Sequence, residues 1–190
     1  VREAMKKLKR LEYRGYDSFG YYDEKICFKK IGEIHIPKTE AKTKKIIMHT
    51  RWATHGGVTE YNAHPHQSCD KKVNIVHNGI IENYEELKKT LISLGHSFTS
   101  ETDSEVIAHF FEEKLKSKKI KDVCIDFMKE AKGEFAVIAM IEGDTNLYAL
   151  KRDSPLVLGL SESMNVLGSD IYAFSYITDK AIFFEDDEFA

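Results

Sequence analysis

Hydrophobic residues recur at spacings of three and four over the first eleven positions, which is the period of an α-helix. Val1, Ala4, Met5, Leu8 and Leu11 would share one face. Three extended segments are expected next, because short apolar runs alternate with turn-forming residues there. They cover residues 18–22, 25–31 and 45–49. The last leads into HTRWATHGG, so polar residues are expected at the end of that strand.

The middle of the chain reads as one strand followed by three helices. A strand is predicted at 73–77, ending at Asn78-Gly79, and an amphipathic helix through Leu87, Leu91 and Leu94 stops at Gly95. Further helices are expected at 104–116 and 120–131. The second has a single apolar stripe that indicates core, made by Ile120, Val123, Cys124, Phe127 and Met128.

From residue 134 the pattern changes to short strands separated by turn signals. They are expected at 135–141, 147–151, 156–160, 165–168 and 181–185. Helices therefore lie between two strand-rich regions, with no repeat or long linker. The sequence predicts a single α+β domain over residues 1–190, in which helices cover two sheets.

Composition is typical of a folded soluble protein. Of the 190 residues, 42% are hydrophobic and 31% charged, and the formal net charge is −3. Acidic and basic residues are interleaved, which favours neither nucleic acid nor a membrane surface as partner. With no apolar run long enough to span a bilayer and no signal-like start, we expect a cytoplasmic protein. Three cysteines without a CxxC motif indicate neither a disulfide framework nor a zinc ribbon.

A cluster of histidines raises the question of a metal site. His49, His55, His64, His66 and His77 fall within 29 residues, and histidine is a common metal ligand. The window has no HExxH motif, a single thiol and few acidic residues. We therefore expect neither a metal nor a cofactor.

The same window fits acyl transfer better, since that chemistry needs fixed donors aimed at a developing oxyanion. The Asn78 amide and the Gly79 backbone N–H could converge on one oxygen. The alternative is that Asn-Gly forms a tight hairpin turn, as it commonly does.

Two charged residues suit an amino acid head group. Arg51 follows a strand and could grip a carboxylate with its planar fork, or form a surface ion pair instead. Asp103 could hold an ammonium group, or cap the helix that begins near residue 104. Their spacing does not establish that they meet.

Six ordered segments make a more specific pattern than any one residue. They are LEYRGYDSFG, HTRWATHGG, NAHPHQS, VHNGIIENYEELK, SETDSEVIAH and SPLVLG. In this order they resemble the glutaminase domain of the glucosamine-6-phosphate synthase family, over nearly the whole chain. The resemblance implies an N-terminal-nucleophile hydrolase fold, a four-layer αββα sandwich, which agrees with the predicted elements.

The resemblance also implies roles for individual residues. Arg51 would bind the glutamine α-carboxylate, Asp103 its α-amino group, and Asn78 with Gly79 would form the oxyanion hole. Further residues would line or close the glutamine pocket, namely Trp52, Thr54, His55 and His64, while Arg14 of the YRGYDS segment would lie near the nucleophile.

The chain departs from the family pattern at both ends. The family's nucleophile is an N-terminal cysteine whose own α-amino group acts as base, whereas this chain begins with Val1. We therefore expect the first strand to be missing and the 190-residue chain to be inactive as a glutaminase. The chain stops at Ala190, before the sugar isomerase region that uses ammonia to convert fructose 6-phosphate to glucosamine 6-phosphate.

The complete enzyme is expected to be a homo-oligomer. Two other readings stay open: the glutaminase domain of another amidotransferase, such as the phosphoribosyl-pyrophosphate enzyme, and a non-catalytic glutamine-binding module.

Overall fold

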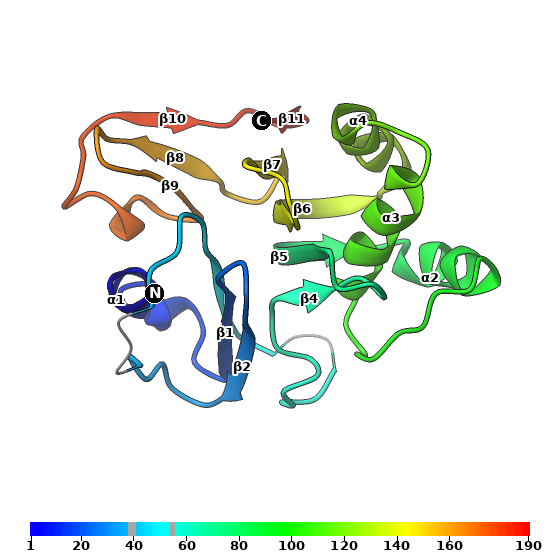
Figure 1. Ribbon diagram of the computed structural model, residues 1–190, viewed down its shortest axis with the longest axis horizontal. Helices are drawn as coiled ribbons and strands as arrows, with labels where there is room; N and C mark the ends of the chain where they lie inside the picture. Colours follow the sequence, from blue (N-terminus) through cyan, green and yellow to red (C-terminus); the bar gives the residue numbers. More distant parts are fainter. Residues whose placement is uncertain (38–40, 54–55) are drawn as a thin grey trace.

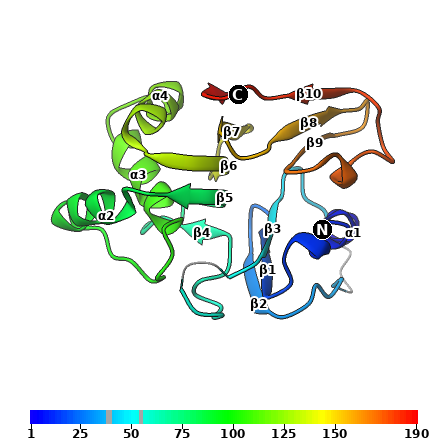
Figure 2. The ribbon, with the colours of Figure 1, turned by 180° about the vertical axis from the view of Figure 1, so that it is seen from behind.

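The computed structural model describes residues 1–37, 41–53 and 56–190, and it places the elements in layers (Figures 1 and 2). The largest sheet is antiparallel with the strand order β11-β7-β6-β5-β4. Its strands are β4 (His66–Gln67), β5 (Val73–Ile81), β6 (Gly133–Ile141), β7 (Leu147–Arg152) and β11 (Glu188–Phe189). Three helices lie on one side of it in both views: α2 (Tyr84–Ser93), α3 (Glu105–Leu115) and α4 (Ile120–Glu130).

Strand β6 shows how this sheet separates two cores. Phe135, Val137 and Ala139 join the cluster formed with the three helices. The alternate residues Ile138 and Met140 pack on the opposite face against other strands. This period of two is what a strand buried on both faces requires.

Two three-stranded antiparallel sheets pack against that opposite face. The first has the order β2-β1-β3, and α1 (Arg2–Lys9) covers its outer side through Met5 and Leu8, which contact Phe19 and Tyr21. The second has the order β10-β8-β9 and reaches the large sheet through Leu156 and partly buried neighbours. The bounds are β1 (Ser18–Tyr22), β2 (Cys27–Ile31), β3 (Ile47–Arg51), β8 (Val157–Leu160), β9 (Asn165–Gly168) and β10 (Ala181–Phe183), with 3₁₀ turns η1 (Glu12–Arg14) and η2 (Ile171–Ala173).

The resulting order is helix, sheet, sheet, helix, as predicted for an α+β sandwich. The predicted helices are confirmed as α1 to α4, and the stripe around Cys124 is buried as core. The short strands β4 and β11 were not predicted, because two residues are too few to show a period.

One prediction was wrong in an informative way. Strand β5 does not stop at His77: Asn78 and Gly79 stay in the strand, opposite Ala136 and Phe135 of β6. The hairpin reading of Asn-Gly is therefore incorrect. The partner strand extends beside this dipeptide, so the ladder continues through residues whose local preference is for a turn.

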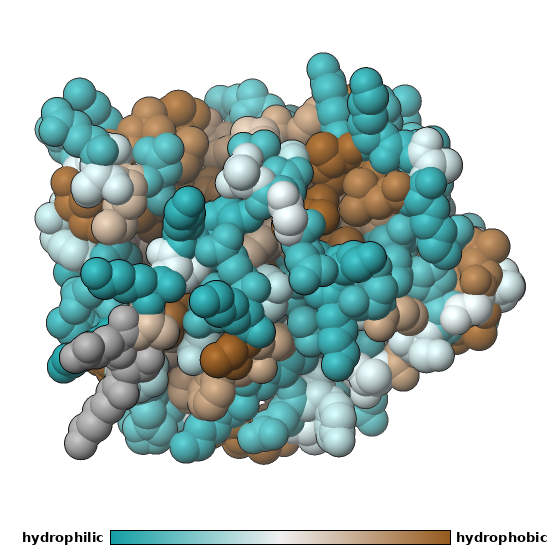
Figure 3. Space-filling model, viewed as in Figure 1, coloured by the Kyte–Doolittle hydropathy of each residue, from teal (hydrophilic) through white to brown (hydrophobic). Residues whose placement is uncertain are grey.

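The surface is mixed in polarity. On the face seen in Figure 3, hydrophobic residues form separate patches between hydrophilic ones. Within the described residues, no helix is long and apolar enough to cross a membrane.

Candidate active site

A cavity of about 290 Å³ opens where the ends of β3, β5 and the segment before α3 meet. Each element contributes polar groups, although the contributing segments lie far apart in the sequence. The cavity is lined by His49, Arg51, Trp52, His64, His77, Asn78, Gly79, Ile80, Thr102, Asp103, Ser104 and Glu134.

Gly79 is the residue that the backbone geometry requires at this point. Its φ of +117° is a conformation that L side chains rarely adopt, and a Cβ there would lie 2.1 Å from the carbonyl oxygen of Glu134. The close approach of β6 therefore leaves room only for glycine beside Asn78.

The side chain of Asn78 is oriented by His49. Nε2 of His49 lies 2.8 Å from Oδ1 of Asn78. Burial lowers the pKa of His49 to about 4, so the ring is neutral at neutral pH. Because the amide oxygen only accepts, Nε2 is the nitrogen that carries the hydrogen and donates it. Asn78 thus retains its two amide N–H groups as donors at the cavity.

Further histidines pack behind the cavity wall. The rings of His49 and His64 stack with centroids 4.2 Å apart, and His66 meets His64 edge-on at 4.5 Å. Burial lowers the pKa of His64 and His66 well below the usual value, and that of His77 to about 4. These rings are therefore neutral imidazoles.

Several buried nitrogens of this wall have no protein partner within the described part of the chain. They are Nδ1 of His49, Nδ1 of His64 and Nε2 of His77. The other nitrogen of His77, Nδ1, lies 2.8 Å from the hydroxyl oxygen of Ser104. Buried polar atoms without partners are rare in folded proteins and are concentrated at functional sites.

The two charged residues predicted for a head group open onto the same cavity. Arg51 is 6% exposed and donates to the carbonyl oxygens of Gly57 and Gly56 at 3.2 and 3.4 Å. Burial lowers the pKa of Arg51, and the nearby Asp17 and Asp103 carboxylates oppose that shift.

Asp103 is held by strand β5. It is 5% exposed, and its Oδ2 accepts a hydrogen bond from the backbone N–H of Ile81 at 2.7 Å. The residue at the N-cap of α3 is Ser104, so the helix-cap reading of Asp103 is incorrect.

The structure thus brings together six of the residues expected at the site, namely Arg51, Trp52, His64, Asn78, Gly79 and Asp103. Arg14 does not line the cavity, since its guanidinium donates to the carbonyl oxygen of Ser169 at 2.9 Å. Thr54 and His55 lie outside the described residues. Six lining residues were not expected, namely His49, His77, Ile80, Thr102, Ser104 and Glu134. Of these, only His49 and His77 carried a signal, their places at the ends of predicted strands.

The histidine window itself forms no metal site in the part of the chain that the structure describes. Its described members, His49, His64, His66 and His77, contribute to no group of three or more candidate ligand atoms.

Comparison with known proteins shows the family to which the chain belongs. The family model described as "Glutamine amidotransferase domain" matches residues 49–176. Relatives named glutamine–fructose-6-phosphate aminotransferase (isomerizing) are similar over almost the whole chain. The protein of Sulfurisphaera tokodaii is 42% identical over 95% of this chain, and that of Thermococcus kodakarensis is 43% identical over 98%. The chain spans about a third of the length of these relatives, 32% and 33% respectively.

Solved structures are similar as well. The glutamine phosphoribosylpyrophosphate amidotransferase of B. subtilis, complexed with ADP and GMP, aligns with a TM-score of 0.76 and 25% identity. The alignment covers 92% of this chain and 40% of the B. subtilis chain. The fold is accordingly an α+β sandwich of the N-terminal-nucleophile hydrolase type, and the chain belongs to the glutamine amidotransferase domain family.

Proposed function

We propose that this domain binds L-glutamine in the cavity and serves its hydrolysis to glutamate and ammonia. The proposal depends on one observation: Arg51, Asp103 and Asn78 all line the same cavity. A cation, an anion and an amide donor are the three groups that an amino acid with a terminal carboxamide needs.

The head group of glutamine is bound by the charged pair. The Arg51 fork donates to the α-carboxylate, and the Asp103 carboxylate accepts from the α-ammonium group. Both side chains are almost fully buried, so these charge-assisted hydrogen bonds are little screened by solvent.

The carboxamide end is polarised by Asn78 and Gly79. When a nucleophile adds to the amide carbon, negative charge develops on the carbonyl oxygen, and fixed N–H donors stabilise that charge. The His49 contact fixes the Asn78 amide before substrate arrives. The backbone N–H of Gly79 is the second donor in this proposal.

The nucleophile implied by the family resemblance is an N-terminal cysteine. Its α-amino group takes the thiol proton, the thiolate adds to the amide carbon, and the proton passes to the departing ammonia. Water then hydrolyses the thioester to release glutamate. None of Cys27, Cys69 and Cys124 lines the cavity, so residues 1–190 should bind glutamine without turning it over.

In the longer protein, the ammonia is used by a sugar isomerase domain to form glucosamine 6-phosphate from fructose 6-phosphate. The names and the greater length of the relatives support this step. We further propose that the longer protein is a cytoplasmic homo-oligomer. The glutamine phosphoribosylpyrophosphate amidotransferase of B. subtilis shares the fold but is less similar in sequence, at 25% identity.

Glutamine binding to the 190-residue chain tests the proposal directly. By calorimetry, Arg51→Ala and Asp103→Asn should each weaken binding roughly 10- to 100-fold, because each removes a charge-assisted hydrogen bond worth about 1.5–3 kcal/mol. The exposed residues Arg2 and Asp122 provide matched controls, and Arg2→Ala and Asp122→Asn should leave binding unchanged. Equal affinity in all four variants would refute the head-group assignment.

A second measurement separates an enzyme from a binding module. A form of the protein that begins with the family's cysteine should release glutamate and ammonia in equal amounts, whereas residues 1–190 should release neither. Binding without turnover in the cysteine form would favour the non-catalytic module.

A further inference from the structure

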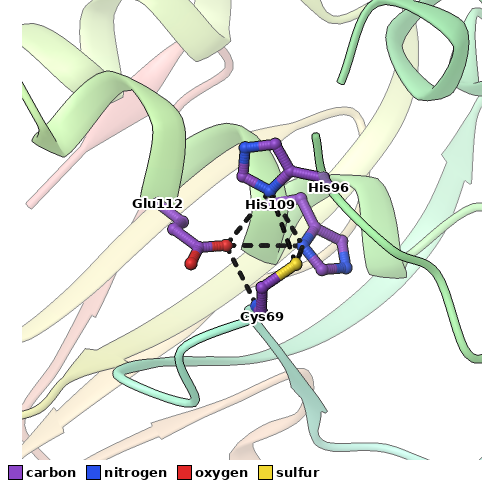
Figure 4. Close-up of side chains that lie close together, drawn as sticks. All are labelled: Cys69, His96, His109 and Glu112. Atoms are coloured by element: carbon purple, nitrogen blue, oxygen red, sulfur yellow. Dashed lines mark hydrogen bonds and ion pairs between the residues drawn. The ribbon is translucent and has the colours of Figure 1, made fainter. Parts of the chain in front are cut away.

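A second cluster of chemically active side chains shares no residue with the lining of the cavity. It consists of Cys69 in the turn between β4 and β5, His96 just after α2, and His109 with Glu112 on α3 (Figure 4). His109 and Glu112 are three residues apart and therefore share one helix face. Their side chains, His96 and Cys69 point toward one another.

Four potential ligand atoms converge in this cluster: Cys69 Sγ, His96 Nδ1, His109 Nδ1 and Glu112 Oε2, all within 4.8 Å of one another. The two nitrogens are 3.3 Å apart, and the sulfur lies 3.7 and 3.5 Å from them. The carboxylate oxygen lies 3.1 and 3.5 Å from the same nitrogens. These five separations are close to the distances of about 3.3–3.7 Å between the ligand atoms of a tetrahedral zinc ion, as its bond lengths dictate, and the sixth, from Cys69 Sγ to Glu112 Oε2, is at most 4.8 Å.

The outer nitrogens of both imidazoles meet carboxylates. His96 Nε2 lies 2.8 Å from Glu113 Oε2, and His109 Nε2 lies 3.5 Å from Glu105 Oε1. Since a carboxylate only accepts, each Nε2 carries hydrogen, and a neutral ring then turns its Nδ1 lone pair toward the cluster. This carboxylate–histidine arrangement is the one that orients histidine ligands around zinc.

The sulfur and the carboxylate are supported in the same way. The backbone N–H of Ser97 donates to Cys69 Sγ at 3.4 Å. The backbone N–H groups of Cys69 and Asp70 donate to the two oxygens of Glu112, each at 3.0 Å. Donors surround the outside of the cluster, and electron pairs face its centre. Such an arrangement is favourable when a cation occupies that centre.

We propose that Cys69, His96, His109 and Glu112 form a structural zinc site. Mixed sulfur, nitrogen and oxygen donors in tetrahedral array select zinc over the hard cations magnesium and calcium. Four protein ligands complete the tetrahedron, so the ion holds structure rather than activating water. The histidines are buried while Cys69 is exposed, which gives the ion a route in.

The ion would join three segments that the sequence separates: the β4–β5 turn, the α2–α3 connection and α3 itself. Glu105 extends this support, because its carboxylate also accepts from the backbone N–H groups of Thr99 and Ser100 at 2.9 and 2.6 Å. The site is independent of glutamine hydrolysis, and its test needs no substrate.

The test is metal binding by the 190-residue chain after removal of bound metal with a chelator. Zinc should bind with one ion per chain in competition with a chromophoric chelator. Cobalt should show thiolate-to-metal charge-transfer absorption. Zinc at about 100-fold its Kd should raise Tm by about 5–10 °C, as expected for a protein of this size.

Variants locate the site. Cys69→Ala should abolish the charge-transfer absorption and weaken zinc binding by at least about 100-fold, because it removes a direct ligand. Glu113→Gln should weaken binding about 10- to 100-fold, since it removes only the outer partner of His96. Cys27→Ala and His35→Gln are matched controls outside the cluster and should bind zinc as the parent does.

Three results would overturn the proposal. Cobalt bound without thiolate absorption would exclude Cys69, and equal zinc affinity in Cys69→Ala and the parent would mean binding elsewhere. A parent chain that binds no zinc would show that the cluster is a hydrogen-bonded imidazole–carboxylate network without metal. Because Cys69 is exposed, Cys69→Ala should fold, and its circular dichroism should match the parent.

Discussion

Two groups of histidines, one in the cavity wall and one in the Cys69 cluster, are built differently. In the cavity wall, His49 and His77 each bond a neutral partner, Asn78 or Ser104, and each has a second nitrogen without a protein partner among the described residues. In the Cys69 cluster, His96 and His109 have carboxylates at both nitrogens.

The difference shows that the partners of a histidine, and not burial alone, indicate its use. Burial keeps the cavity imidazoles uncharged, and there His49 orients the Asn78 amide. Carboxylate partners make an imidazole a better electron-pair donor and so favour a cation. The sequence window with most histidines is thus the one without a metal-type arrangement in the described residues.

The largest expected effect concerns Asn78, the group that His49 orients. In a form of the protein that begins with the family's cysteine, Asn78→Ala should lower kcat about 10²–10³-fold with little change in glutamine KM, because the lost donor acts mainly on the transition state. Steady-state glutamate release measures both constants, and Asn146→Ala on the surface serves as control. A raised KM with unchanged kcat would place Asn78 in substrate binding only.

The second largest expected effect is a loss of folding stability in acid, caused by the histidines of the cavity wall. The folded pKa of His77 is about 4 against an ordinary 6.5, so the unfolded chain takes up the proton first as pH falls. The stabilisation is complete above about pH 6.5 and is lost toward pH 4, at a cost of about 3 kcal/mol for this residue.

Urea unfolding between about pH 7 and pH 4 would show this loss as a falling free energy of unfolding. His77→Gln should make the profile less steep, since His49, His64 and His66 still contribute to it. His35→Gln, at an exposed position outside both groups, should keep the parent slope. A parent profile in His77→Gln would mean that His77 is not the neutral buried group described here.

The smallest effect concerns the neutral partner of His77. Ser104→Ala removes the hydroxyl that lies 2.8 Å from Nδ1 and leaves a buried nitrogen unpaired, which should cost about 1–2 kcal/mol, or a fall in Tm of several degrees. Calorimetry can compare it with Ser163→Ala, an exposed serine. No difference between the two would mean that the Ser104 contact adds nothing to stability.

The amino-acid sequence by itself determined most of the elements and the fold class. Helices α1 to α4 and most strands follow from apolar periods of 3.6 and 2, because burying one face of a helix or strand is a local requirement that each segment meets separately. The ordered motifs also indicated the family. They identified six residues that line the cavity, including Arg51, Asn78 and Asp103.

Only the tertiary structure decided how those residues are used. Asn78-Gly79 prefers a turn locally, but pairing with β6 keeps it in a strand, where a single close approach to Glu134 requires glycine. Cys69, His96, His109 and Glu112 follow no metal-binding spacing, because their ligands come from a turn, a loop and a helix. Their convergence depends on how α2 and α3 pack over the sheet, and such long-range packing leaves no local pattern in the chain.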